Sequence, residues 1–245
     1  MGTKGKKVIR AIDRITDAIL MIFFALCLVL GLYIAYDSYY VYTQASSDRM
    51  SGFKPAVAEG ENIDTGVLKE LSKDVVGWLT IDGTSIDYPV MQGGSNTDYL
   101  NKDPYGDFSL SGSIFVDSAN AGDFTDSYSL IYGHHMERGF MFGALDDYRD
   151  EAFGNTHTTG RIITVDGRII ELRLCAVINA LTTEGIIFDV RYANRNIEGL
   201  IEYINNNKIY VRDVEIDGVR LYALSTCTSS TSQERLIVLF REVNG

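Results

Sequence analysis

Apolar and polar residues are arranged in two different ways along the chain, which begins with one long apolar segment and continues as many short apolar runs. The long segment extends from Ala18 to Tyr36 (AILMIFFALCLVLGLYIAY) and contains no charged residue. At about 1.5 Å per residue it spans roughly 28 Å, the thickness of a bilayer's hydrocarbon interior. The pattern therefore predicts a transmembrane helix over residues 18–36.

The pattern after this span predicts a linker, a short helix and a set of strands. Residues 43–62 show no period and are typical of a juxtamembrane linker. Asp64 is expected to cap an amphipathic helix that runs to about Val75. Short apolar or alternating runs, typical of strands, follow at residues 78–81, 86–90, 113–116, 128–132, 161–172, 219–224 and 236–241.

Turn and helix signals then predict how these strands are joined. Asp82-Gly83 indicates a hairpin with a loop longer than two residues, and Asp166-Gly167 indicates a type I′ hairpin turn. Helices are expected near residues 140–150 and 197–206. About eight short strands joined in this way favour an antiparallel barrel or sandwich with peripheral helices.

The residues that flank the apolar segment predict its orientation. Five basic and two acidic residues precede it, so the positive-inside rule places the N-terminus in the cytoplasm. Several tyrosines between residues 33 and 42 fit an aromatic belt at the outer face of the membrane. A cleaved signal peptide is the alternative, but its apolar region usually has about 7–15 residues, so we expect a retained anchor. The expected domains are a cytoplasmic basic tail at 1–17, a transmembrane anchor at 18–36, a juxtamembrane linker at 37–62 and an extracellular domain at 63–245.

Composition and charge narrow the classes of partner. The chain has 245 residues, 46% of them hydrophobic, which is enough to bury one core. Five of its 22 basic and two of its 33 acidic residues precede the span, so the remainder carries 17 against 31 and a net charge of −14. An acidic extracellular domain argues against a nucleic-acid partner.

The cysteines and histidines are too few and too scattered for a disulfide framework or a zinc site. Cys27 lies in the membrane span and Cys175 in the apolar run 169–178, where it is expected to be a small buried hydrophobe. The three histidines include the adjacent pair His134 and His135, which would face opposite sides of a strand, and His157, which is expected in a solvated loop. None has the ligand spacing of a metal site, so no metal is expected.

Cys227 ends one strand signal, and Arg235 opens the next. A thiol with a pKa near 8.5 is only a few per cent thiolate at neutral pH, so a catalytic cysteine needs a histidine or cation nearby. If the two strands pair, the loop between them brings the guanidinium of Arg235 back beside the thiol, where it could donate to an oxyanion or to a substrate carbonyl. An inert, buried cysteine is the alternative.

The sequence resembles the sortases, and more narrowly class B. The resemblance rests on Leu130-Ile-Tyr-Gly-His-His-Met136, Leu224-Ser-Thr-Cys227 and Arg235-Leu-Ile-Val, in that order. Shorter matches lie at residues 96–100, 112–117 and 141–145, and the similarity extends from about Val76 to Arg241. The N-terminal helix and the helix at 197–206 are features that set class B apart. The resemblance implies a closed eight-stranded β-barrel.

The resemblance also assigns roles to individual residues. Cys227 would be the nucleophile, His134 the general acid and base, and Arg235 the residue that holds the substrate or the oxyanion. Asn96 and Leu100 match positions that line the substrate groove, and Ser225, two residues before the nucleophile, would face the same side as Cys227. Thr228 departs from the class, because some class B members have an acidic residue there, so no contact is carried over to it.

Sortases are membrane-anchored transpeptidases of Gram-positive bacteria, and the resemblance implies that activity here. The thiolate would cleave a C-terminal sorting motif of a surface protein after its threonine, and an amine of a cell-wall peptide or peptidoglycan precursor would resolve the thioacyl enzyme. No cofactor is expected, and selectivity is expected to depend on residues 180–210. Two alternatives stay open, a cysteine hydrolase on the same barrel, which releases its acyl group to water, and a non-enzymatic surface scaffold.

Overall fold

The computed structural model describes residues 3–57, 63–212, 218–227 and 233–243, and the chain divides into two compact units, Met1–Thr43 and Gln44–Gly245. The first unit is a single helix that forms most of α1 (Thr3–Ala45). This helix contains an apolar window with a mean hydropathy of 2.8, long enough to cross a membrane. Between Ile12 and Tyr36 its large apolar side chains are 48% exposed or more within the structure, as expected of a helix that contacts lipid. It is therefore a candidate membrane span.

The segment that was expected to be an irregular linker is largely helical. The helix α1 continues to Ala45, and a 3₁₀ helix, η1 (Ser47–Phe53), follows at once. Ala45 and Met50 are buried in the core of the second unit, and the hydroxyl of Tyr88 donates to the Ala45 carbonyl over 3.0 Å. The second unit therefore begins at Gln44, earlier than the boundary at residue 63 that the pattern suggests.

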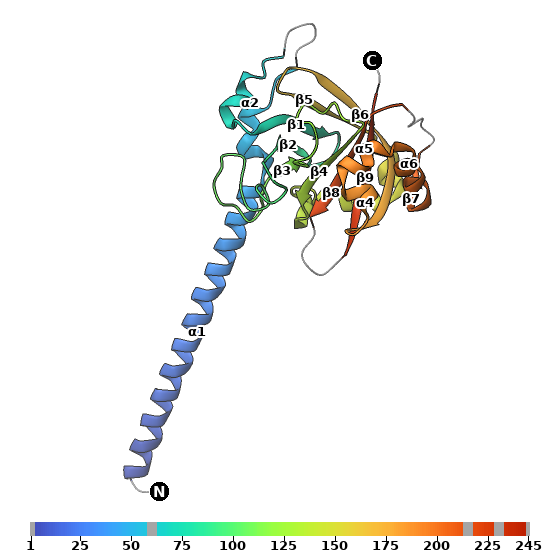
Figure 1. Ribbon diagram of the computed structural model, residues 1–245. Coiled ribbons are helices and arrows are strands. Elements are labelled where there is room, and N and C mark those ends of the chain that lie inside the picture. The colour runs from blue at the N-terminus through green and yellow to red at the C-terminus, as the bar shows by residue number, and fades with distance from the viewer. Residues whose placement is uncertain (1–2, 58–62, 213–217, 228–232, 244–245) are drawn as a thin grey trace. The chain divides into compact units, whose positions relative to one another are not determined.

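Nine strands in the described part of the second unit form one sheet, which closes on itself (Figure 1). The strand order is β5-β1-β2-β3-β4-β8-β9-β6-β7, and β5 also pairs with β6. Eight strands therefore make a closed ring, and β7 extends the sheet beyond β6. The strands are β1 (Val75–Ile81), β2 (Asp87–Met91), β3 (Ile114–Val116), β4 (Tyr128–His134), β5 (Thr159–Thr164), β6 (Ile169–Leu181), β7 (Lys208–Val211), β8 (Leu221–Cys227) and β9 (Glu234–Glu242).

The predicted eight-stranded barrel is confirmed, but its strands are mixed in direction and not all antiparallel. Two neighbouring pairs, β2 with β3 and β4 with β8, run parallel. A parallel pair needs a long crossover, and the chain supplies one before β3 and another between β4 and β8. The pair of β4 and β8 places the ends of these two strands next to each other.

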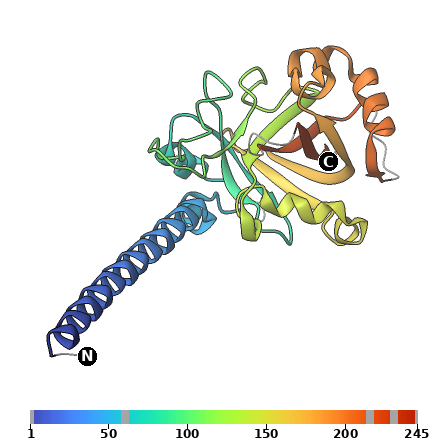
Figure 2. The ribbon, with the colours of Figure 1, turned by 90° about the horizontal axis from the view of Figure 1, so that it is seen from below.

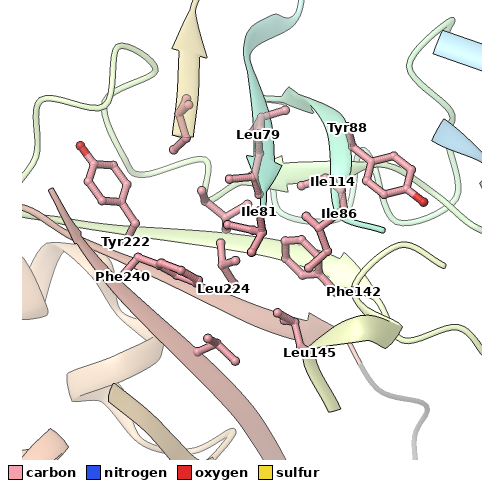
Figure 3. Close-up of a cluster of buried hydrophobic side chains, with 14 of the residues drawn as sticks. Leu79, Ile81, Ile86, Tyr88, Ile114, Phe142, Leu145, Tyr222, Leu224 and Phe240 are labelled. Carbon is pink, nitrogen blue, oxygen red and sulfur yellow. The ribbon is translucent and has the colours of Figure 1, made fainter. Parts of the chain in front are cut away.

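Alternation along the strands separates an inner core from a second, outer cluster. Leu224 and Phe240 point into the barrel together with residues of the opposite strands, as Figure 3 shows. Tyr128 and Ala223 lie on the other face of the sheet, in a cluster covered by helices. These helices, which Figures 1 and 2 show gathered at one side of the barrel, are α4 (Gly185–Phe188), α5 (Val190–Arg195) and α6 (Ile197–Asn206).

Several local predictions differ from the structure in detail. The helix predicted from Asp64 is the shorter α2 (Gly66–Leu71). The helix predicted near residues 140–150 consists of two 3₁₀ turns, η2 (Glu137–Gly139) and η3 (Gly143–Arg149), which α3 (Glu151–Thr156) follows. Met141, with a φ of +52°, lies between the two turns and outside the right-handed helical region.

The turn between β5 and β6 is not of type I′. That type requires a positive φ at both central residues, but Gly167 has a φ of +87° and Asp166 does not have a positive φ. The Gly167 amide donates to the Thr164 carbonyl over 3.0 Å, so the loop is longer than the predicted two residues. The predicted helix at 197–206 coincides with α6.

Candidate active site

Three strand ends meet at one position of the barrel. His134 is the last residue of β4, and its Cα partner in the parallel pair with β8 is Cys227, the last residue of that strand. The strands β8 and β9 pair antiparallel as far as Ser225 opposite Ile237. Cys227 lies two residues beyond this pair along β8, and Arg235 lies two residues before Ile237 on β9. Residues separated by 93 and by 8 positions in the sequence therefore share one edge of the sheet.

All three positions belong to the outer face of the sheet, which α4–α6 cover farther along the strands. On β4, His134 alternates in step with Leu130, and on β9, Arg235 alternates in step with Ile237. Position 227 is two residues beyond Ser225 and four beyond Ala223, which belongs to the outer cluster. The side chain of Cys227 and residues 228–232, including Thr228, lie outside the described residues.

The imidazole of His134 is half-buried and is held by a backbone carbonyl. Its Nε2 lies 2.6 Å from the carbonyl oxygen of Leu100. A carbonyl oxygen only accepts, so Nε2 carries the proton of this hydrogen bond, and Nδ1 is the nitrogen that remains for other proton transfers. Leu100 therefore fixes both the orientation and the tautomer of His134.

Two glycines permit this close packing around His134. Gly112 has a φ of +58°, and a Cβ there would lie 2.4 Å from the Leu100 oxygen and 3.0 Å from Cδ2 of His134. Gly133 precedes the histidine, and a Cβ there would lie 2.4 Å from a methyl carbon of Ile114 and 2.7 Å from the ring of Phe142. Sequence analysis identified both segments as motifs, but the contacts that require glycine come from the fold.

The other two histidines lie elsewhere. His135 is exposed, and its Nε2 lies 2.6 Å from a carboxylate oxygen of Asp146, away from the Leu100 carbonyl that holds His134. The prediction of a solvated loop residue is wrong for His157, which is half-buried and stacks on Phe153 with 3.8 Å between ring centroids. The apolar environment of the ring explains this position.

A buried carboxylate supports the loop that carries Leu100. Asp117, only 3% exposed, accepts from Nδ2 of Asn96 at 2.7 Å and from the hydroxyl of Tyr132 at 3.2 Å. The Asn96 Oδ1 accepts from the Ser118 amide, also at 2.7 Å. Both ends of the Asn96 amide are thus occupied within the protein, and Leu100 offers its carbonyl to His134. The roles of Asn96 and Leu100 in binding substrate stay predictions.

Asp117 and Tyr132 were not identified from the sequence as part of the site. Tyr132 is two residues before His134 on β4, and Asp117 follows β3 directly, so their alternation and position could have drawn attention to them. The hydrogen bonds that Tyr132 and Asn96 donate to Asp117, however, span 15 and 21 positions of sequence.

The remaining predicted residues are placed as follows. Ser225 is 1% exposed, and its backbone pairs with Tyr132 on one side and Ile237 on the other. Arg235 is half-buried in β9, where its backbone partner on the far side is Ala180 of β6. Cys175 is a buried small hydrophobe, as predicted. Its burial raises the pKa of the thiol to about 12, so the thiol stays protonated. The absence of a metal stays a prediction.

Comparisons with known proteins identify the family. No family model matches the chain. Sortase B of Listeria monocytogenes is 33% identical over 172 residues, which are 69% of this chain and 68% of that protein. The crystal structure of a Streptococcus pyogenes class B sortase involved in pilus biogenesis has a TM-score of 0.66 and 34% identity, and the match covers 74% of this chain and 98% of that one.

A Staphylococcus aureus sortase B-substrate complex is also similar, with a TM-score of 0.66, 27% identity, and coverage of 73% of this chain and 84% of that one. These matches agree with the mixed eight-stranded barrel. The chain therefore belongs to the sortase B family of cysteine transpeptidases.

Proposed function

We propose that the chain cleaves a C-terminal sorting motif after its threonine and joins the acyl part to an amine of the cell wall, with Cys227 as nucleophile. The observation that carries the proposal is the strand register, in which His134 pairs with Cys227, while Arg235 begins β9, the other neighbour of β8. A thiol, an imidazole and a guanidinium at one sheet edge provide a nucleophile, a proton carrier and an oxyanion donor.

The first half of the reaction forms a thioester. The thiolate of Cys227 attacks the carbonyl carbon of the scissile peptide bond, a carbon–sulfur bond forms, and the carbon–nitrogen bond breaks. The departing amine takes a proton from the imidazolium of His134. Because Nε2 is directed at the Leu100 carbonyl, Nδ1 is the nitrogen that gives this proton.

The second half regenerates the thiolate. A cell-wall amine attacks the thioester carbon and passes a proton to Nδ1 of His134, the new carbon–nitrogen bond forms, and the carbon–sulfur bond breaks. Arg235 donates hydrogen bonds to the carbonyl oxygen, which becomes negatively charged in both halves. The reaction needs thiolate and imidazolium at the same time, and we expect this state to be a minority one, so turnover is expected to be slow.

The same proposal includes the location of the enzyme. The candidate span in α1 anchors the chain, and the basic residues before it keep the N-terminus in the cytoplasm, so that the barrel lies outside the cell. The similarity to the S. aureus sortase B-substrate complex supports a first partner that binds as a substrate, here the sorting motif of a surface protein. Selectivity for that motif is expected to depend on residues 180–210, which contain α4–α6.

Intact-mass analysis tests the function directly. The chain is mixed with a panel of sorting-motif peptides, with and without amines of the cell-wall type, and the mass of protein and products is followed. An acyl adduct on Cys227 that becomes an amide only when amine is present supports transpeptidation. An adduct that is released to water regardless of amine supports the hydrolase, and no adduct together with a thiol that a reactive probe does not label supports the scaffold.

A further inference from the structure

The loop between β2 and β3 has a polarity opposite to that of an ordinary water-exposed loop. Phe108 and Leu110 are 73% and 58% exposed, whereas Ser109 and Ser111 are 3% and 1% exposed. The two serine hydroxyls hydrogen-bond each other at 2.8 Å in the protein interior. Apolar side chains thus point outward, and polar side chains point inward, over four consecutive residues.

This arrangement is unfavourable in water. Burying a Phe or Leu side chain stabilises a fold, yet here both stay exposed while hydroxyls take the interior positions. Single exposed apolar residues are ordinary, but two with polar neighbours turned inward resemble the surface of a segment that contacts an apolar phase. Phe108 and Leu110, the apolar pair, therefore indicate a partner.

Contacts of the same loop place it against the segment that follows the membrane helix. The hydroxyl of Tyr105 donates to the Arg49 carbonyl over 3.0 Å, and the Arg49 guanidinium lies 5.3 Å from the centroid of the Tyr105 ring. The rings of Tyr105 and Phe53 meet edge to face with 6.1 Å between centroids. Arg49 also approaches Asp103 to 3.6 Å. The loop therefore packs on η1, which begins two residues after α1 ends.

The chain connection favours the bilayer as the partner. The tyrosines that fit an interfacial belt extend to Tyr42, and three further residues, about 5 Å of helix, lead to Ala45. Few residues therefore join the candidate span to the segment on which the loop packs. The same loop carries Leu100, whose carbonyl oxygen lies 2.6 Å from Nε2 of His134, and Gly112, where a Cβ would lie 3.0 Å from Cδ2 of His134.

We propose that Phe108 and Leu110 enter the interfacial layer of the membrane and dock the barrel on the bilayer. The inference rests on the proposed membrane anchor. Docking would hold His134 at a fixed height above the lipid, where substrates that are themselves anchored in the membrane can reach it. Docking would not improve the access of a free peptide to His134.

Tryptophan fluorescence in vesicles tests the docking. The full chain is reconstituted into vesicles of anionic and zwitterionic phospholipid, with or without bromine atoms near the headgroup end of the acyl chains. Phe108→Trp is compared with Ile209→Trp, a second exposed apolar position (39% exposed) on β7, and with Leu30→Trp inside the candidate span. The natural Trp78 is 1% exposed in the core, so the unsubstituted chain supplies the background.

The expected result is that Phe108→Trp and Leu30→Trp lose emission in brominated vesicles, whereas Ile209→Trp keeps its emission. Quenching at Leu30→Trp together with none at Phe108→Trp overturns the docking and leaves the anchor intact. Loss of quenching at Leu30→Trp overturns the anchor and the docking together. Protection of Phe108→Trp from a water-soluble quencher that increases with protein density, without quenching by lipid, identifies a second copy of the chain as the partner and also overturns the proposal.

Discussion

Replacement of Gly112 by alanine should disable the site through one backbone oxygen. The new Cβ would lie 2.4 Å from the Leu100 carbonyl oxygen, the same atom that accepts from Nε2 of His134 at 2.6 Å. Ordinary contact begins near 3.4 Å, so the loop and the new methyl group must separate by about 1 Å. Such a shift lengthens the hydrogen bond beyond its usual limit of about 3.2 Å and releases the imidazole.

The magnitude follows from geometry and conformation. A misplacement of about 1 Å near a reacting group costs roughly 10²-fold in rate, so turnover by Gly112→Ala should fall by about that factor. Alanine at a φ of +58° also costs about 1–2 kcal/mol in the free energy of unfolding. Activity must therefore be separated from stability.

Gly106 provides the matched control. It lies in the same loop with a φ of +94°, and a Cβ there would meet nothing within 4 Å. Gly106→Ala therefore carries a similar conformational cost without moving the Leu100 carbonyl. Both variants are assayed as the full chain in detergent micelles, with turnover of a sorting-motif peptide expressed per folded molecule from denaturant unfolding. Equal turnover in the two variants would refute the role of the carbonyl.

Four further changes test the site and the fold. Cys227→Ala should abolish turnover and leave the unfolding midpoint unchanged, and rates comparable to wild type would disprove the nucleophile. Arg235→Lys should lose most turnover of the same peptide because a point charge cannot replace a planar fork of donors, whereas near-normal activity would indicate a packing role. Asp117→Asn removes the charged group that accepts hydrogen bonds from Asn96 and Tyr132. It should lower kcat and destabilise the fold by about 1–3 kcal/mol, and an unchanged kcat would show that these hydrogen bonds do not support the active site. Burial raises the pKa of Asp87, but hydrogen bonds from Lys54, Trp78 and Thr80 outweigh it and hold the pKa below the ordinary value. Its stabilisation is therefore present above the unfolded-state pKa of about 4 and is lost as the pH falls through the folded-state pKa, so Asp87→Asn should lower the denaturant midpoint at neutral pH and progressively less in acid. A constant difference at all pH values would contradict this.

The sequence alone determined what depends on neighbours along the chain. An uncharged apolar run is sufficient to predict the candidate span, and short alternating runs predict strands because burial of one face is encoded with a period of two. The cysteine, histidine and arginine could be named because each lies in a short motif with a recognisable order. The predicted helix at 197–206 coincides with α6 because its helical spacing and the Asn196 cap are local as well.

The tertiary structure decided which strands are neighbours and what surrounds each motif. Alternation assigns a residue to a face but does not choose the partner strand, so the parallel pair of β4 and β8 was missed even though it joins His134 to Cys227. The sequence also did not predict the hydrogen bond between His134 and the Leu100 carbonyl or the one from Asn96 to Asp117, because both join segments far apart in the sequence. Such contacts stabilise the protein only after the loop between the two segments has closed, so no local sequence pattern predicts them.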